Sequence, residues 1–262
     1  MRTCIFWAVL ILSASAFAAT GKWTVEAHHG CKVWDDPPYA EGYTTDYRLW
    51  WSGACSEGYA SGEGYLQWSV LPDKRYPNTP PLVFAQYDGT IVKGKLQGKG
   101  KLETSGSYTY TGDFVDGQFE GAGVETWSRG DHFEGRYANG YRNGWGTYSF
   151  ANGDSRSGEF KNDARQDGFQ TYDWGASKDH FEGNVVGNLP EGQGFLIDKT
   201  GKHEGNWVAG KLTIGSTTYS VFPVQKNEKP SQPVLESLTL SSARSFSNLL
   251  KTSPGPYPSA GA

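Results

Sequence analysis

The feature that most constrains the fold is a pattern of glycines and aromatic residues that recurs along the middle of the chain. In one copy, Tyr110 is followed by glycines at positions 112, 117, 121 and 123. The frame, aromatic-x-Gly-x(4)-Gly-x(3)-Gly-x-Gly, recurs with intervals of 36, 23, 23, 23, 25 and 22 residues between its lead glycines, which are Gly53, Gly89, Gly112, Gly135, Gly158, Gly183 and Gly205. A fixed period of this length predicts a repeat architecture.

Each copy has the pattern of a β-hairpin. Large and small residues alternate in the first half, as in Tyr110-x-Gly112-x-Phe114, so they share one face of a strand. The middle of a copy carries Asp116-Gly117 or the equivalent Asn-Gly, which suit a two-residue turn at positive φ. Asn188 replaces the turn glycine in a later copy, and asparagine also tolerates positive φ. The copies at 156–174 and 203–212 are degraded.

The frame resembles the MORN (membrane occupation and recognition nexus) repeat, over about residues 48–212. The resemblance implies an all-β fold: an elongated, single-layer, twisted antiparallel sheet of about seven stacked hairpins with an aromatic-lined groove. The opening of the first copy, residues 51–64, is similar to that of exported bacterial members with a cysteine in the first repeat. The family implies a recognition scaffold and supplies no catalytic residue to carry over.

Composition limits the alternatives. The chain has 35 glycines in 262 residues, about twice the usual share, which disfavours a mostly helical protein. The net charge is −4, from 24 basic and 28 acidic residues, without the basic excess of a nucleic-acid binder. Polybasic clusters are lacking too, so we expect no binding to anionic membranes.

The first 18 residues have the pattern of a secretory signal. One basic residue, Arg2, precedes an apolar run over residues 4–12, and the segment ends in Ala16-Phe17-Ala18, an A-x-A cleavage site. The run is shorter than the ~20 residues that span a bilayer; an uncleaved N-terminal anchor is the alternative. We expect an exported protein, in the periplasm by preference, or else secreted or at the cell surface.

Two cysteines remain after the signal, Cys31 and Cys55. An even count in an exported chain indicates a disulfide. A reactive thiol or a metal site with His28 and His29 is the competing interpretation. The prediction is a disulfide with no metal and no cofactor.

Three segments lie outside the repeat frame. Residues 19–47 are expected to cap the first hairpin. A proline-rich insertion, residues 69–86, is expected to leave the sheet, and its Lys74, Arg75 and Tyr76 are either a recognition element or part of a tolerated insertion. Residues 213–262 read as a strand and linker, a short amphipathic helix over 235–250 that caps the array or binds a partner, and a disordered tail over 252–262.

The search for chemistry finds no marked catalytic motif, so the chain is predicted not to be an enzyme. The main hypothesis is a non-catalytic scaffold or binding module of the bacterial cell envelope. The candidate binding face is a set of aromatic residues: Trp51, Tyr110, Tyr137, Tyr148 and Trp174. The same rings could instead pack only on one another and on glycine.

The partner is expected to be another envelope protein. A carbohydrate, such as peptidoglycan stacked on the aromatic face, is the alternative, and a lipid-associated role is a weaker one. The open edge of the sheet could also pair with another chain, so a dimer is conceivable.

Overall fold

The structure, a computed structural model, describes residues 22–35, 47–70, 80–105 and 108–221. These ranges contain nineteen strands. Within them there is no helix, and hence none that could cross a lipid bilayer. The predicted signal segment (1–18), the residues Lys74, Arg75 and Tyr76, the predicted helix (235–250) and the C-terminal tail lie outside the described residues.

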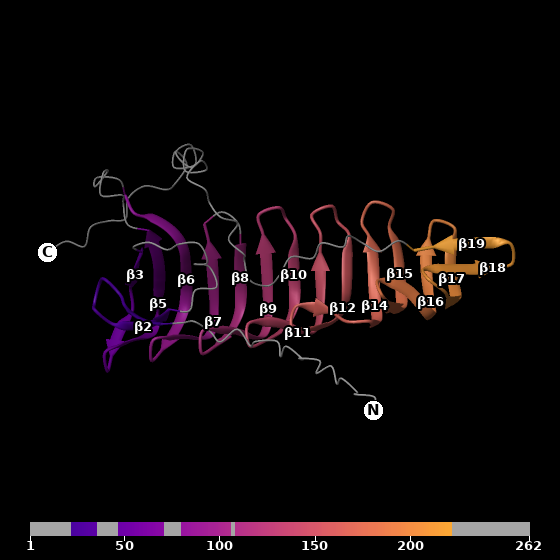
Figure 1. Cartoon of the computed structure of the whole chain (residues 1–262). Coiled ribbons are helices and arrows are strands. Elements are labelled where there is room, and N and C mark those ends of the chain that lie inside the picture. Colours follow the sequence, from indigo (N-terminus) through magenta and orange to yellow (C-terminus); the bar gives the residue numbers. More distant parts are fainter. Residues whose placement is uncertain (1–21, 36–46, 71–79, 106–107, 222–262) are drawn as a thin grey trace, which may run out of the picture.

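Thirteen strands form one long antiparallel ladder in which each strand pairs with the next along the chain (Figure 1). They are β3 (Tyr47–Trp51), β5 (Tyr59–Val70), β6 (Leu82–Val92), β7 (Lys95–Thr104), β8 (Tyr108–Val115), β9 (Gln118–Trp127), β10 (His132–Ala138), β11 (Tyr141–Ser149), β12 (Ser155–Lys161), β14 (Gly168–Trp174), β15 (Asp179–Val186), β16 (Leu189–Asp198) and β17 (Gly201–Trp207). Because neighbours in sequence are neighbours in space, the molecule is elongated. This confirms the predicted all-β array of stacked hairpins.

The remaining strands are short and lie at the ends or at irregularities of the ladder. They are β1 (Lys22–Val25), β2 (Lys32–Asp35), β4 (Ala54–Ser56), β13 (Ala164–Arg165), β18 (Lys211–Ile214) and β19 (Thr217–Ser220). The first two and the last two form antiparallel hairpins of their own.

The two-residue turns follow the sequence prediction. Asp116 and Gly117 have φ of 52° and 90°, and Asn139 and Gly140 have φ of 52° and 84°. Two successive positive φ values match the turn that suits the right-handed twist of a hairpin. Asn188, at φ 70°, adopts the conformation for which asparagine substitutes for glycine.

A row of glycines crosses the ladder and sets its packing. Gly100, for example, pairs with Gly89 on one side and with Gly112 on the other. A Cβ on Gly89 would lie 2.4 Å from the Tyr87 hydroxyl oxygen, and a Cβ on Gly100 would lie 2.4 Å from Cε2 of the same ring. The lead aromatic ring of a repeat therefore lies flat over the glycine pair of its own hairpin, where no side chain fits beside it. We call the side of the sheet that carries these rings the inner face and the opposite side the outer face.

The inner face carries the hydrophobic core. The lead residues Tyr87, Tyr110 and Phe133 are fully buried. Adjacent rings meet edge-on, as Tyr87 does with Phe114 at 5.1 Å between centroids, a geometry that the ring quadrupole favours. Each hairpin thus depends on its neighbours for burial, as in other repeat arrays.

The predicted insertion over residues 69–86 is shorter than expected. Leu82 pairs with Val70 and Val83 with Ser69; after a bulge at Phe84 the pairing resumes with Ala85 opposite Trp68. The prolines mark the reason: Pro80 and Pro81 precede β6, and the apolar stretch after them has free N–H groups for the ladder. Residues 69–70 of the insertion belong to β5, and residues 82–86 belong to β6.

The C-terminal end of the ladder is covered by the β18–β19 hairpin. A Cβ on Gly205 would lie 2.7 Å from the Leu212 side chain, so Leu212 takes the place that a lead ring occupies elsewhere. The His203 ring stacks on Tyr219 at 3.8 Å between centroids. The last repeat, which stops halfway in sequence, therefore ends in a hairpin that packs on the inner face of β17.

Candidate interaction surface

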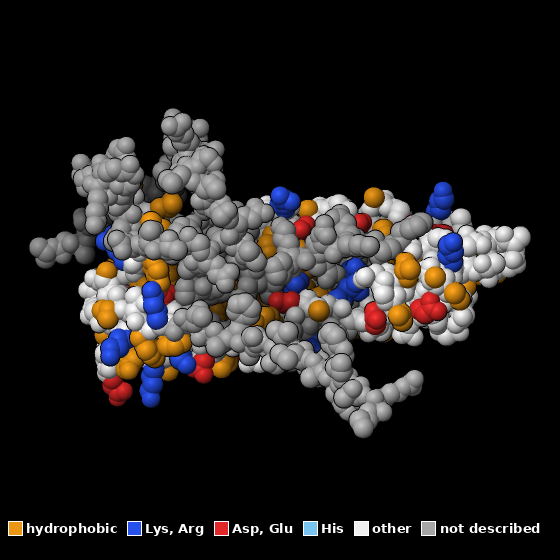
Figure 2. All heavy atoms as spheres, viewed as in Figure 1, with side chains coloured by type: hydrophobic (Ala, Val, Ile, Leu, Met, Phe, Trp, Pro, Cys, Tyr) orange, Lys and Arg blue, Asp and Glu red, His pale blue; other side chains and the backbone are white. Residues whose placement is uncertain are grey.

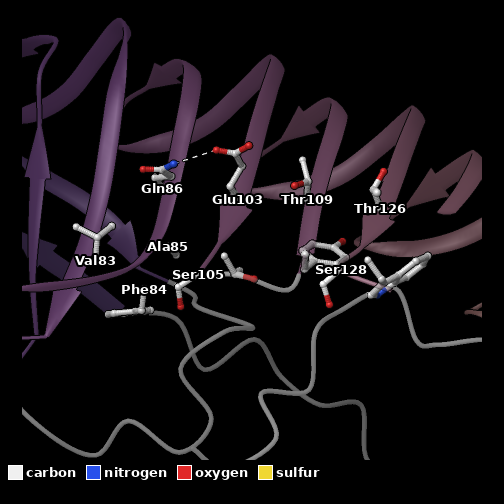
Figure 3. Close-up of a pocket in the computed structure, with 12 residues that line it drawn as sticks. Val83, Phe84, Ala85, Gln86, Glu103, Ser105, Thr109, Thr126 and Ser128 are labelled. Carbon is white, nitrogen blue, oxygen red and sulfur yellow. Dashed lines mark hydrogen bonds between the residues drawn. The ribbon is translucent and has the colours of Figure 1, made fainter. Parts of the chain in front are cut away.

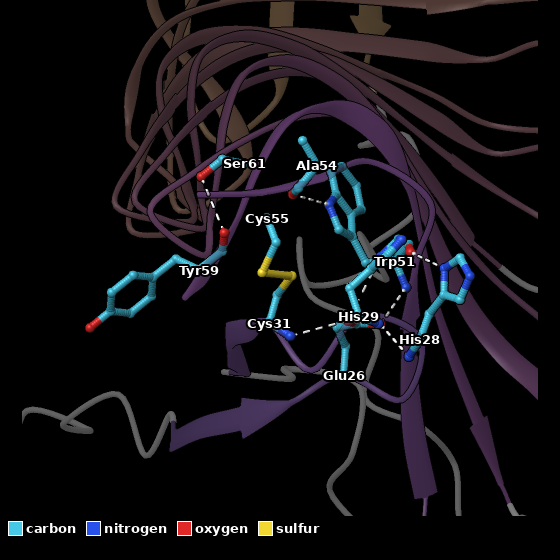
Figure 4. Close-up of a disulfide and its surroundings, with 9 residues drawn as sticks. All are labelled: Glu26, His28, His29, Cys31, Trp51, Ala54, Cys55, Tyr59 and Ser61. Atoms are coloured by element: carbon cyan, nitrogen blue, oxygen red, sulfur yellow. Dashed lines mark hydrogen bonds and ion pairs between the residues drawn. A yellow bond between two sulfur atoms is a disulfide. The ribbon is translucent and has the colours of Figure 1, made fainter. Parts of the chain in front are cut away.

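The N-terminal hairpin is joined to the first repeat by the predicted disulfide. Cys31 and Cys55 are bonded, which confirms that pairing (Figure 4). The backbone N–H of Lys32 donates to the carbonyl of Gly58, and that of Trp34 to the carbonyl of Gly94. The segment that contains β1 and β2 is thus fastened to the turns of the first two hairpins.

The alternative of a metal site at this end finds no support in the geometry. Glu26, His29 and Cys31 have ligand atoms within 4.8 Å of one another, but the Cys31 sulfur belongs to the disulfide. The Glu26 carboxylate accepts hydrogen bonds from the backbone N–H groups of His28, His29, Cys31 and Trp51 (Figure 4). Burial raises its pKa, but these hydrogen bonds outweigh that effect and lower it. The carboxylate therefore holds the loop together.

The predicted binding face is a core in the structure. Trp51, Tyr110, Tyr137 and Tyr148 have exposures of 0 to 3%, and Trp174 is partly buried against the core, where its ring meets Tyr172. Tyr110, for instance, stacks on Phe119 at 3.7 Å and meets Tyr137 at 5.2 Å between centroids. These four rings do not form a surface for a partner, which corrects the prediction. The competing interpretation, that the rings pack on one another and on glycine, describes the structure.

In one repeat, the lead residue is a charged arginine instead of an aromatic residue. Arg156 stands where other copies have an aromatic residue, and the opposite glycine is replaced by Gln170. Both side chains are buried. The Arg156 guanidinium donates to Tyr172 Oη at 3.1 Å and to Asn188 Oδ1 at 3.0 Å, and Tyr172 donates to Gln170 Oε1 at 3.0 Å. A polar network thus replaces the ring-on-glycine contact.

This exchange predicts strong coupling between the two positions. We expect Arg156→Tyr alone to cost about 2 kcal/mol, because the new ring would overlap Gln170. Gln170→Gly alone should cost about as much, because it leaves buried donors unpaired. The double variant restores the ring-on-glycine contact and should lie within ~1 kcal/mol of the parent. Urea denaturation followed by circular dichroism measures all three; simply additive costs would contradict the exchange.

A notch lies at one edge of the ladder, where β6 and β8 begin and β7 and β9 end (Figure 3). Its volume is about 480 Å³. Polar groups line one side of it, among them Gln86, whose amide donates to Glu103 at 2.9 Å. Hydrogen bonds from Lys101 and Gln86 lower the pKa of Glu103. None of the lining residues is a histidine, a cysteine or a lysine, so the notch offers hydrogen bonds and one carboxylate.

The outer face carries an exposed pair of aromatic rings that the sequence interpretation missed. Trp145 lies on β11 and Phe169 on β14, and they are 45% and 48% exposed. Their ring planes are 29° from parallel, with centroids 6.3 Å apart. Their neighbours in sequence, Gly146 and Gln170, face the inner side, so both rings project outward.

A second exposed ring lies at the N-terminal end, where Trp23 (45% exposed) meets Trp34 at 5.2 Å and Tyr59 at 5.1 Å between centroids. Figure 2 shows one face of the molecule, where hydrophobic side chains outside the grey atoms lie among charged ones rather than in one continuous patch. Single exposed apolar residues of this kind are normal on a protein surface. Trp145 and Phe169 differ from such single residues, because two exposed rings contact each other on the outer face of the ladder.

The fold and this surface define a class: a repeat protein built of stacked β-hairpins, with a packed inner face and an open outer face. The MORN repeat model matches residues 87–107, 110–132, 133–155 and 181–202, so these segments are MORN repeats. The chain is thus a repeat-based binding module. The copies led by Trp51 and Arg156 are not matched, although they form hairpins of the same ladder. No curated protein matches the sequence.

Proposed function

We propose that the protein is a non-catalytic scaffold of the bacterial cell envelope that binds another envelope protein through the outer face of its repeat sheet. The observation that carries the proposal is the exposed pair Trp145 and Phe169 on that face. Tryptophan and other aromatic residues are enriched at the centres of protein interfaces, because they bury a large area in few rotamers. The ladder beneath the pair holds both rings in place.

The inner face is a poor alternative. Its rings are buried and occupied with one another. A partner could reach them only by opening the core, which would cost the packing of several repeats. Binding at the outer face leaves the core intact.

The proposed location has two supports. Residues 1–18 have the pattern of a signal segment. The Cys31–Cys55 disulfide fits an oxidising compartment such as the periplasm. Fractionation of cells that express the tagged full chain, with reduced and non-reduced gels of each fraction, tests this part. Recovery of the chain in the cytosol with both thiols free would contradict it.

The test of the binding surface is affinity capture from envelope extracts with three versions of the full chain. We expect Trp145→Ala/Phe169→Ala to lose at least nine-tenths of the captured partner, about 1.4 kcal/mol or more. Val186→Ala/Ile197→Ala is the matched control, because it also removes two exposed apolar side chains from strands of the ladder. The control should capture as the parent does.

Thermal unfolding must be the same for all three versions. Equal capture by the parent and by Trp145→Ala/Phe169→Ala would contradict the proposal. A second arm replaces the extract with insoluble polysaccharide and with peptidoglycan sacculi. If the parent chain is retained on these glycans and Trp145→Ala/Phe169→Ala is not, the outer face recognises a glycan and not a protein.

A further inference from the structure

One carboxylate lies on the strand between the two exposed rings. Glu159, on β12, is directly opposite Trp145 of β11. On the other side of β12, Gln166 donates its backbone N–H to the Glu159 carbonyl, and β14, which carries Phe169, pairs with residues 155–157 of β12. The Trp145 and Phe169 rings, one from each side of β12, are 6.3 Å apart between centroids. The three residues therefore form one short row on the outer face: ring, carboxylate, ring. We call it the Trp–Glu–Phe row.

Glu159 is exposed, and it has no hydrogen bond or ion pair of its side chain among the residues that the structure describes. Acidic side chains on β14 and β15 differ in this respect. Asp173 and Glu182 both contact His180, at 2.7 and 3.6 Å. Glu159 is thus a negative charge between two aromatic rings without a partner of its own in the described part of the chain.

This combination favours a positive charge. Aromatic faces attract a cation within ~6 Å of the ring centroid. Half of the 6.3 Å separation is about 3.2 Å, so a cation above the midpoint lies within that range of both rings. An anionic or purely apolar group would instead face Glu159, whose charge it could not neutralise. The net charge of −4 would also attract a basic partner over a longer range.

Among cationic groups, the guanidinium of arginine fits best. It is flat and stacks on aromatic rings, and its fork of N–H donors matches a carboxylate. An ammonium is a compact, strongly hydrated charge that gains less from the rings. We propose that the Trp–Glu–Phe row binds an arginine side chain on an exposed segment of the partner protein. This rests on the proposed function and names the chemistry that the outer face recognises.

The experiment titrates the full chain with N-acetyl-arginine amide and follows the indole N–H signals of tryptophan by NMR. The Trp145 signal, assigned by its absence in Trp145→Phe, should shift with a dissociation constant on the order of millimolar. N-acetyl-citrulline amide, which is neutral but of the same shape, should cause no shift. The indole signal of Trp50, which is also partly exposed but lies on β3, should not respond to either.

Two variants show whether the Glu159 carboxylate itself binds arginine or whether the negative charge of the sheet as a whole attracts it. Glu159→Gln should weaken arginine binding about fivefold, and Glu182→Gln, the matched control, should leave it unchanged. Equal shifts with arginine and citrulline, equal binding by Glu159→Gln, or tetramethylammonium as good as arginine would each overturn the arginine assignment.

The same variants keep this inference distinct from the proposed function. If Trp145→Ala/Phe169→Ala loses the captured partner while Glu159→Gln keeps it and arginine amide does not bind, the outer face binds protein but not through arginine. If arginine amide binds as expected and Trp145→Ala/Phe169→Ala still captures the partner, the row exists but does not serve the proposed function.

Discussion

Replacing Gly146 by alanine is expected to lower the free energy of unfolding by about 3 kcal/mol, the upper end of the usual cost of overpacking. A Cβ at this position would lie 2.2 Å from Cζ of Phe133. The ring cannot move away, because it is fully buried and packs on Phe160 at 5.0 Å and under the Arg142 guanidinium at 5.0 Å. Urea denaturation followed by circular dichroism measures the loss.

A double-mutant cycle shows whether the ring is the cause. Phe133→Ala alone should cost about 3 to 4 kcal/mol through the cavity it leaves. If steric overlap explains Gly146→Ala, adding it to Phe133→Ala should cost little more. Gly192→Ala is a second control, because nothing lies within 4 Å of the added Cβ and only its positive φ of 81° penalises it, by about 1 to 2 kcal/mol. Additive costs in the cycle would contradict the overlap.

Much of the fold could be predicted because the decisive residues are local. Glycine at a strand position and Asp-Gly or Asn-Gly at a turn restrict the backbone over a few residues, and the period of 23 repeats the restriction. Asn188 is an example: it replaces the turn glycine of its copy, and its φ of 70° keeps the conformation that glycine adopts in the other copies. The error in the insertion has the opposite origin: Pro80 and Pro81 lie outside the strands, but the residues directly after them pair with β5.

The functional surface was harder to predict for a physical reason. Alternation in a strand tells which residues share a face, but not what covers that face. Tyr110 and Tyr148 could therefore be read from the sequence either as a binding surface or as a core. Only the distances between the rings in the structure show that they belong to the core. The outward rings did leave a signal. Trp145 directly precedes Gly146, which lies under the Phe133 ring, and a residue next to such a strand glycine points to the opposite face.

A similar signal marks a carboxylic acid in the core. Glu125 follows Gly123 by two residues, so it faces inward, and it is fully buried. Tyr108 Oη donates to its Oε1 at 2.5 Å, whereas Oε2 is buried without a hydrogen-bond partner among the described residues. The net effect of its surroundings raises its pKa to about 8: burial raises the pKa most, the Tyr108 hydrogen bond and the positive charge of Arg142 lower it, and the negative charge of Asp163 raises it. Tyr137 also borders the carboxyl group, and the pKa of its hydroxyl is raised by burial and by Glu125.

The raised pKa makes the stability of the array depend on pH. In the unfolded chain a glutamate titrates near its ordinary value of 4.5, and in the folded chain Glu125 titrates near 8. Folding thus favours the protonated form of Glu125. The contribution of this group to the free energy of unfolding is complete below pH 4.5 and is lost as the pH rises through 8. Over that window the free energy of unfolding should fall by about 4 kcal/mol.

Glu125→Gln should remove this dependence. The amide keeps the shape and an acceptor for Tyr108 but carries no charge. We therefore expect the variant to match the parent within about 1 kcal/mol at pH 5 and to exceed it by about 3 to 4 kcal/mol at pH 8.5. Glu134→Gln, a change at an exposed position of β10, is the control and should alter neither value. Urea midpoints at both pH values decide. A parent as stable at pH 8.5 as at pH 5, or a variant that keeps the parent's decline, would mean that Glu125 is ionised and neutralised within the core, with Arg142 as its counter-ion.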